Sequence, residues 1–227
     1  MILASGEMFL DNPVFHGRLW DATAETLLMM VFTTLAVAAV GLPQGVLLHS
    51  VSPKGLTPAA PVYRVISLIV DFGRSIPFII LMIALIPFTR FVVGSALGWQ
   101  ATVVPLAVGA IPFFARLVQN ALREVDSGKV EAVQMMGASK GHITYHVLIR
   151  EALPGIVGAL TVTVVTLISY TAMAGTIGGG GLGALAIDYG YRRYQSDTMV
   201  ACIVLLVALV ALVQWIGDTV VRKIDHR

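Results

Sequence analysis

The chain has 227 residues, of which only 12% are charged and 57% are hydrophobic, and its mean hydropathy is +0.85. A soluble domain carries about 25% charged residues, so this sequence cannot cover a soluble surface and indicates an integral membrane protein of one domain. The net charge of +2 is too small to indicate a nucleic-acid partner. The single cysteine, Cys202, lies in an apolar run and has no partner for an intrachain disulfide.

Uncharged runs predict the membrane spans, because a spanning helix needs about 20 mostly apolar residues. Five spans are predicted, at about 26–48, 76–89, 101–117, 153–174 and 198–217. Residues 61–74 read as a helix that lies partly in the interface and leads into the second span, which Pro77 and Pro87 bracket. Residues 175–194 begin with a glycine-rich run and predict an irregular segment. The predicted fold is all-α: a single polytopic membrane domain, residues 1–227, with five transmembrane helices.

The basic residues predict how the chain is oriented, because Lys and Arg favour the cytoplasmic side of a membrane. Five spans put the two termini on opposite sides. With the N-terminus outside, eleven of the fifteen Lys and Arg residues fall in the cytoplasm, and the four that remain outside are Arg18, Arg90, Arg192 and Arg193. The N-terminal residues lack the order of a secretory signal peptide, so we expect no cleavage. We predict an N-terminus outside and a C-terminus in the cytoplasm.

The longest polar interval, residues 126–150, lies between the third and fourth spans. Asp126 opens a helix-start signal, and Gly137 ends the helix as glycine does at a left-handed C-terminal position. Ser139 can cap a second helix. Further on, Pro154 predicts a turn into the fourth span.

The first of these loop helices carries an apolar stripe, because Val130, Val133 and Met136 recur at a spacing of three. Glu131, in its first turn, suits the positive end of the helix dipole. A short helix with an exposed apolar stripe at the cytoplasmic face fits a groove on another protein. The alternative is an amphipathic connector that rests on lipid.

The loop spacing resembles that of a known family. Glu131-Ala132, then Gly137, then Val147 is similar to the EAA loop of ABC-importer permeases. Several longer segments resemble the permeases of methionine importers: Phe72–Leu81, Ile86–Arg90, Val104–Arg116, Tyr170–Gly175 and Gly180–Gly183. One position departs from the family, because Arg150 stands where the loop of the family has a proline.

The resemblance implies a type I importer in the bacterial inner membrane. Two permease copies work with two ATPase subunits and an extracytoplasmic methionine-binding protein, and the pathway alternates between inward-open and outward-open. It also implies that the cytoplasmic loop is a coupling helix that contacts the ATPase through Val130, Glu131, Ala132, Val133, Met136 and Gly137. The residues implied to line the pathway at the dimer interface are Ser169, Tyr170 and Met173, and we expect Met173 to narrow it when closed.

Other site chemistries find little support in the residues. A Walker A loop needs Gly-Lys-Ser/Thr, but Lys129 is followed by Val130, so ATP hydrolysis is expected on a separate subunit and this chain is not expected to be an enzyme. The GxGxxG match at residues 178–183 lacks the context of that motif, which is a strand before it, a helix after it and an acidic residue about 20 residues further on, so no nucleotide cofactor is expected. His142 and His146 could share a helix face but lack a third ligand, so no metal site is expected.

Two alternatives stay open. The chain could be an ABC permease for another small amino acid or a related solute. It could also be an ATP-independent carrier or channel, although ionisable groups within the spans are scarce and no inverted repeat is apparent. A membrane enzyme would need catalytic groups at depth, and the spans hold almost none. Asp71 and Arg74 are spaced to pair on one helix face, which favours a structural pair.

The predicted orientation can be tested with a single cysteine. In a Cys202→Ser background, Ser139→Cys should be labelled by a membrane-impermeant thiol reagent only in inverted vesicles, because residue 139 is predicted to be cytoplasmic. Labelling of intact cells or spheroplasts from outside would contradict the orientation.

Overall fold

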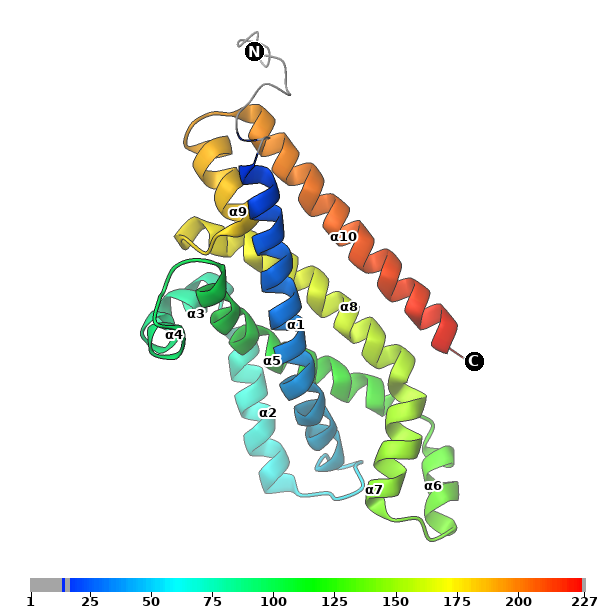
Figure 1. Ribbon diagram of the computed structural model, residues 1–227. Helices are drawn as coiled ribbons and strands as arrows, with labels where there is room; N and C mark the ends of the chain where they lie inside the picture. The colour runs from blue at the N-terminus through cyan, green and yellow to red at the C-terminus, as the bar shows by residue number, and fades with distance from the viewer. Residues whose placement is uncertain (1–13, 15–16, 226–227) are drawn as a thin grey trace. The chain divides into compact units, whose positions relative to one another are not determined.

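The computed structural model describes Val14 and residues 17–225, and all regular structure in these residues is helical (Figure 1), which confirms the predicted all-α class. The long helices are α1 (Arg18–Ser50), α5 (Trp99–Arg123), α8 (Ile149–Ala174) and α10 (Ser196–Ile224). The shorter α-helices are α2 (Ala60–Ser75), α3 (Phe78–Ala84), α4 (Ile86–Val93), α6 (Ser127–Met135), α7 (Lys140–Ile143) and α9 (Gly181–Leu185). Two π-helical segments, Thr144–Leu148 and Ala186–Tyr191, continue α7 and α9.

The helices match a protein that crosses the membrane several times. Within the described residues, four helical stretches are long and apolar enough to span, at Arg18–Ser50, Trp99–Arg123, Lys140–Ile177 and Ser196–Ile224. A fifth is obtained if α2 and α3, which are broken at Ile76 and Pro77, count as one span. The two termini, whose sides the charge distribution predicts, lie at residues 1–13 and 226–227, outside the described residues.

The second predicted span differs from the structure. Instead of one helix over 76–89, two short helices meet at Leu85. Pro77 is the N-cap residue of α3, and Pro87 lies in the first turn of α4. Both prolines therefore start a helix, which is where the missing N–H costs nothing, rather than bracketing one long helix.

Two further predictions were wrong. The irregular segment predicted for residues 175–194 is helical at Gly181–Tyr191, because residues of α1 cap the start of α9. The turn predicted at Pro154 is absent, because Pro154 lies inside α8 and the helix continues through it. A proline within a spanning helix is tolerated where neighbouring groups re-satisfy the backbone.

The chain divides into two compact units. Unit 1 takes the chain up to Leu35, then Pro77–Val108 and Val164–Val213. Unit 2 takes Ala36–Ile76, Gly109–Thr163 and the chain from Gln214 onward. Each long helix contributes residues to both units, so the boundaries between the units fall within helices.

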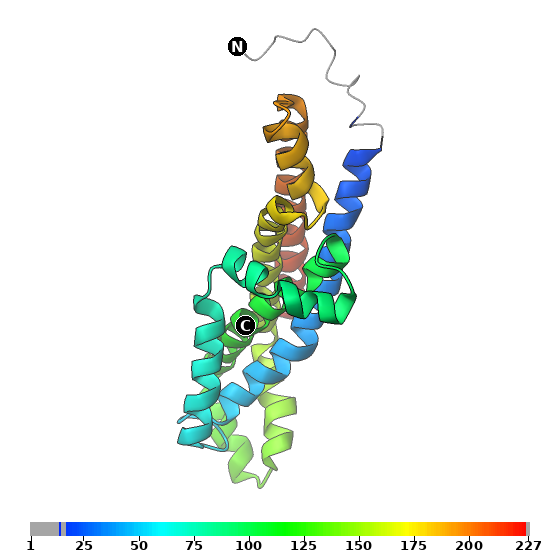
Figure 2. The same ribbon diagram turned by 90° about the vertical axis from the view of Figure 1, so that its left-hand side faces the viewer.

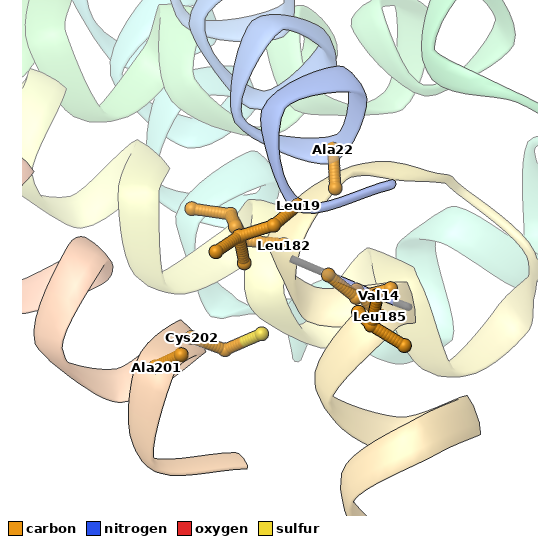
Figure 3. Packing of buried hydrophobic residues seen from close by; sticks show 7 residues of the cluster. All are labelled: Val14, Leu19, Ala22, Leu182, Leu185, Ala201 and Cys202. Atoms are coloured by element: carbon orange, nitrogen blue, oxygen red, sulfur yellow. The ribbon is translucent and has the colours of Figure 1, made fainter. Parts of the chain in front are cut away.

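The core of unit 1 lies where the start of α1 meets α9 and α10 (Figure 3). Its buried side chains come from three distant parts of the chain: Val14, Leu19, Ala22, Leu182, Leu185, Ala201 and Cys202. Cys202 is fully buried in this cluster. Burying these apolar groups against one another holds the start of α9 beside the first turns of α1.

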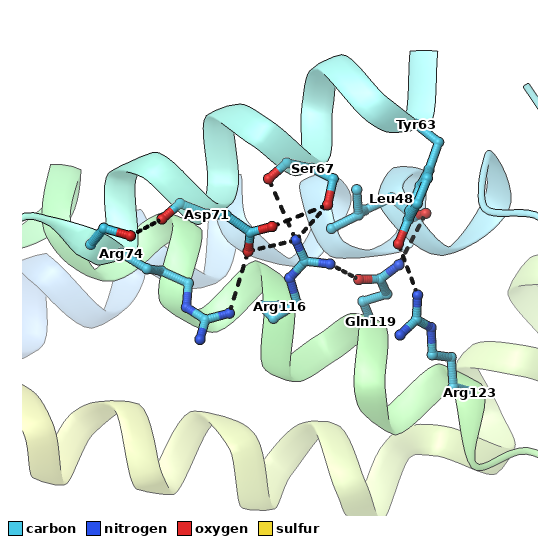
Figure 4. Close-up of polar contacts among 9 residues, drawn as sticks. Leu48, Tyr63, Ser67, Asp71, Arg74, Arg116, Gln119 and Arg123 are labelled. Atoms are coloured by element: carbon cyan, nitrogen blue, oxygen red, sulfur yellow. Dashed lines mark hydrogen bonds and ion pairs between the residues drawn. The ribbon is translucent and has the colours of Figure 1, made fainter. Parts of the chain in front are cut away.

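In unit 2, a polar network joins α2 to α5 and α1 (Figure 4). Arg116 on α5 is its centre: the guanidinium donates to Asp71 Oδ1 and to Ser67 Oγ, both at 2.8 Å. A second nitrogen of Arg116 donates to Gln119 Oε1 at 2.7 Å, and Gln119 in turn donates to the carbonyl of Leu48 at 3.4 Å. A mostly buried cation on an apolar helix is thus paired with a carboxylate and linked by hydrogen bonds across three helices.

The pair anticipated from the sequence, Asp71 with Arg74, is present but long, at 3.8 Å. Sequence spacing could not reveal Arg116 as the closer partner of Asp71, because the two residues are 45 positions apart. The Arg116 side chain is only 13% exposed, whereas that of Asp71 is 55% exposed. Removing one partner of this ion pair should therefore cost more than it does in a surface pair and less than in a fully buried one.

Asp71→Ala should destabilise the protein, because it leaves the mostly buried Arg116 guanidinium without its counter-ion. Between the values for surface and buried pairs, we expect a loss of about 1–3 kcal/mol, seen as a lower midpoint of thermal unfolding in detergent. Arg74→Gln is the matched control, since it removes only the 3.8 Å contact. Equal effects of the two substitutions would contradict the central role of Arg116.

Candidate functional site

The polar interval folds into a helical hairpin within unit 2, in which α6 lies beside α7 and the π-helical segment Thr144–Leu148 (Figures 1 and 2). Three local signals read from the sequence are confirmed. Asp126 Oδ1 accepts from the N–H of Gly128 at 2.8 Å, and Ser139 Oγ accepts from the N–H of His142 at 3.3 Å. Gly137 has φ +79°, the left-handed conformation that ends a helix. Both helices of the hairpin are therefore capped by their own residues.

The predicted apolar stripe does not stay on one exposed face. Val130 and Val133 are half-buried, whereas Met136 is 77% exposed. On the facing segment, Ile143 and Leu148 are buried. The two valines lie on the less exposed side of α6. The exposed apolar surface at the end of the helix is therefore formed by methionine side chains.

Two exposed apolar side chains were missed by the sequence reasoning. Met135 is 90% exposed beside Met136, and Tyr145 is 71% exposed on the π-helical segment. The adjacent Met135-Met136 pair at the end of a polar helix was the available signal. Flexible, polarisable methionines are common on surfaces that bind other proteins.

The remaining predicted coupling residues lie on the outside of the hairpin. Glu131, Ala132 and Gly137 are all exposed. Lys129 forms an ion pair with Glu151 of α8 at 2.5 Å, which ties α6 to the start of that long helix. Both side chains are substantially exposed, so this pair orients the hairpin more than it stabilises it.

The predicted pathway residues divide between two sides of α8 in unit 1. Ser169 and Met173 are exposed, and Thr176, three positions further, continues the same face. Tyr170 is half-buried and stacks on Phe78 of α3, with ring centroids 4.4 Å apart and planes at 3°. The structure therefore brings Ser169 and Met173 together on one face and turns Tyr170 toward α3.

The geometry of the described residues does not support a metal site or a nucleotide-binding site. No group of three His, Cys, Asp or Glu side chains that could hold a metal occurs among them. His142 and His146 stack at 4.3 Å between ring centroids. The glycine-rich segment 178–183 follows a short helical turn, Gly175–Ile177, whereas the dinucleotide motif requires a strand there.

Comparison with known proteins gives consistent results. Residues 41–226 match the family described as "Binding-protein-dependent transport system inner membrane component". The chain is 49% identical to the probable D-methionine transport system permease protein MetI of Vibrio cholerae, over 92% of this chain and 93% of that protein. It is 44% identical to the methionine import system permease protein MetP of Bacillus subtilis, over 92% and 95% of the two chains.

Solved structures agree with these relatives. A chain from "Inward facing conformations of the MetNI methionine ABC transporter" superposes with a TM-score of 0.92 at 45% identity, covering 96% of this chain and 100% of that one. An amino acid ABC transporter shares the fold, with a TM-score of 0.79 at 18% identity, covering 96% and 100%. This chain therefore belongs to the binding-protein-dependent transport system inner membrane components, a family of multi-pass permeases of the inner membrane.

Proposed function

We propose that this chain is the permease subunit of an ATP-driven methionine importer and that two copies form the translocation pathway by alternating access. The observation that carries the proposal is 49% identity, over 92% of the chain, to a D-methionine permease. The MetNI chain that superposes with a TM-score of 0.92 supports the same assignment. The whole chain, residues 1–227, serves as one permease domain, with residues 126–150 as its coupling loop.

The pathway face is the exposed side of α8 in unit 1. Ser169 provides a hydroxyl group, Met173 provides a flexible thioether and is 40% exposed, and Thr176, in the helical turn that follows α8, provides a second hydroxyl group. A second copy completes the pathway, because the described residues of one chain supply at most five spans. Met173 narrows the closed pathway, and the stacking of Tyr170 on Phe78 fixes the rotation of α8 about its axis.

The hairpin transmits movement from a separate ATPase subunit. Met135 and Met136 supply the apolar contact, and Glu131, Ala132 and Gly137 form its exposed edge. Val130 and Val133 keep α6 against the rest of the hairpin. Because Asp126 and Ser139 cap the two helices, the hairpin moves as a rigid body, and the Lys129–Glu151 ion pair passes the movement to α8.

The charge distribution supports the orientation that this mechanism requires. Eleven of fifteen basic residues fall on the hairpin side of the predicted spans, so the hairpin lies in the cytoplasm with the C-terminus, and the N-terminus lies outside. ATP hydrolysis takes place on the separate subunit, because this chain has no Gly-Lys-Ser/Thr loop. An extracytoplasmic binding protein delivers methionine from the other side.

Transport by proteoliposomes that contain the permease, its ATPase and its binding protein tests the assignment. Methionine uptake should require ATP and binding protein, each omitted in turn, because neither ATP hydrolysis nor high-affinity capture resides in this chain. Uptake without ATP would identify a carrier or channel instead. Stimulation of ATP hydrolysis by a binding protein for a different amino acid, and not by the methionine-binding protein, would reassign the substrate.

Gly137→Asp should uncouple transport while the spans stay folded. A Cβ atom at this position would meet no other part of the protein within 4 Å, so a side chain causes no clash. The positive φ of Gly137 costs an aspartate about 1–2 kcal/mol of backbone strain. The substitution also places a negative charge beside Met136. We expect co-purification of the ATPase to be lost and uptake to fall, with an unchanged helical circular dichroism spectrum.

Gly141→Asp is the matched control, because Gly141 also has open space around it but has an ordinary φ and lies in the first turn of α7. A carboxylate there suits the helix dipole. Equal losses for the two variants would show that charge in the loop, rather than the shape and contact at Gly137, is responsible.

A further inference from the structure

Two side chains of α1 hold the start of α9 in unit 1. Glu25 Oε2 accepts from the N–H of Gly181 at 2.7 Å, and Thr26 Oγ1 accepts from the N–H of Leu182 at 2.9 Å. The Thr26 hydroxyl also donates to the carbonyl of Ala22 at 2.9 Å, so it acts as a hydrogen-bond donor and as an acceptor at the same time. We call these contacts the Glu25–Thr26 clamp.

The clamp supplies hydrogen-bond acceptors for the first N–H groups of α9, which the neighbouring residues in the sequence do not provide. The first N–H groups of any helix need outside acceptors, and the residue before α9 is Gly180, which has no side chain to offer one. The bond between Thr26 and Leu182 is buried, since Thr26 is 1% exposed and Leu182 is fully buried, whereas Glu25 is half-buried. Unsatisfied N–H groups in apolar surroundings are expensive, so α1 provides the cap from 156 positions away in sequence.

The turn before α9 is shaped to fit the clamp. Gly178, Gly180 and Gly181 have φ of +83°, +78° and +74°. A side chain at Gly181 would come within 2.7 Å of Thr26 Oγ1 and of Met29 Cε, and one at Gly180 within 2.7 Å of Glu25 Oε2. Glycine is therefore required both by the backbone conformation and by the close approach of the two clamp residues.

The same turn is also tied to the start of α5. Gly98 donates its N–H to the carbonyl of Gly178 at 2.9 Å, and Thr102 Oγ1 donates to the carbonyl of Gly179 at 3.1 Å. The turn begins two positions after Thr176, which lies in the short helical turn Gly175–Ile177 that follows α8. It is therefore a fixed structure at one end of the proposed pathway face.

We propose that Glu25 and Thr26 are positioning residues that hold the turn Gly178–Gly183 in place and thereby seal the outer end of the pathway when no binding protein is docked. The inference rests on the proposed function, which places the start of α1 outside. Glu25 acts through the turn and not on the substrate. A hydrogen bond from a helix N-terminus to a carboxylate is stronger than one between neutral groups. Such a bond suits a contact that must hold between transport cycles.

The test uses the full importer with its ATPase and binding protein, and two readouts. One is ATP hydrolysis without binding protein. The other is labelling of Thr176→Cys, in a Cys202→Ser background, by an impermeant maleimide added from outside. Glu25→Ala and Thr26→Val each remove one acceptor, and we expect each to raise both readouts by about five- to tenfold, as the loss of one hydrogen bond predicts.

Two further variants separate positioning from general effects. Glu25→Gln keeps an acceptor oxygen at the same reach, so it should rescue most of the seal. Asp21→Ala removes an exposed carboxylate one turn earlier on α1 and should leave both readouts at the wild-type value. An equal response to Asp21→Ala would point to lost surface charge and overturn the proposal.

The remaining outcomes are also decisive. If Glu25→Ala and Thr26→Val assemble and match the wild type in both readouts, the clamp does not seal the pathway. If neither variant assembles, the clamp serves folding and the proposal is again overturned. A wild-type importer whose ATP hydrolysis the binding protein does not stimulate would refute the proposed function instead, independently of the clamp.

Discussion

A polar group in apolar surroundings must find a partner within the protein, and this constraint decides most of what is specific about the structure. Helices satisfy their own backbone groups except at their ends. In unit 1 the start of α9 has no capping side chain of its own, so Glu25 and Thr26 of α1 accept its N–H groups. The glycines of the preceding turn leave room for them. A tertiary contact therefore replaces a local cap and fixes two distant segments together.

The same constraint organises unit 2. Arg116 stands on an apolar helix with most of its side chain buried, and it is accommodated because Asp71, Ser67 and Gln119 accept hydrogen bonds from the two terminal nitrogens of its guanidinium. The network reaches the backbone of α1 through Leu48. α2, which is otherwise largely exposed, is thereby tied to α5 by directed bonds as well as by packing.

The hairpin lies outside the apolar part of the chain, and its helices are capped by neighbouring residues rather than by distant ones. Its caps are local, through Asp126 and Ser139, and its two methionines, Met135 and Met136, are largely exposed. A rigid element with an exposed apolar tip is suited to receiving force from another protein. The second half of the hairpin, α7 with its π-helical segment, belongs to the same continuous helical stretch as α8, Lys140–Ile177.

Sequence alone determined the features that depend on composition and on neighbouring residues. Low charge predicted a membrane protein, uncharged runs located the four long helices, and Asp126, Gly137 and Ser139 marked the hairpin, because capping and left-handed turns are local events. Only the tertiary structure decided the rest. It capped α9 with α1 where glycine content predicted an irregular segment, carried α8 through Pro154, paired Asp71 with Arg116, and turned Val130 and Val133 toward the less exposed side of the hairpin. Each of these outcomes depends on which distant groups come within hydrogen-bond or packing distance, and residue spacing along the chain does not encode that distance.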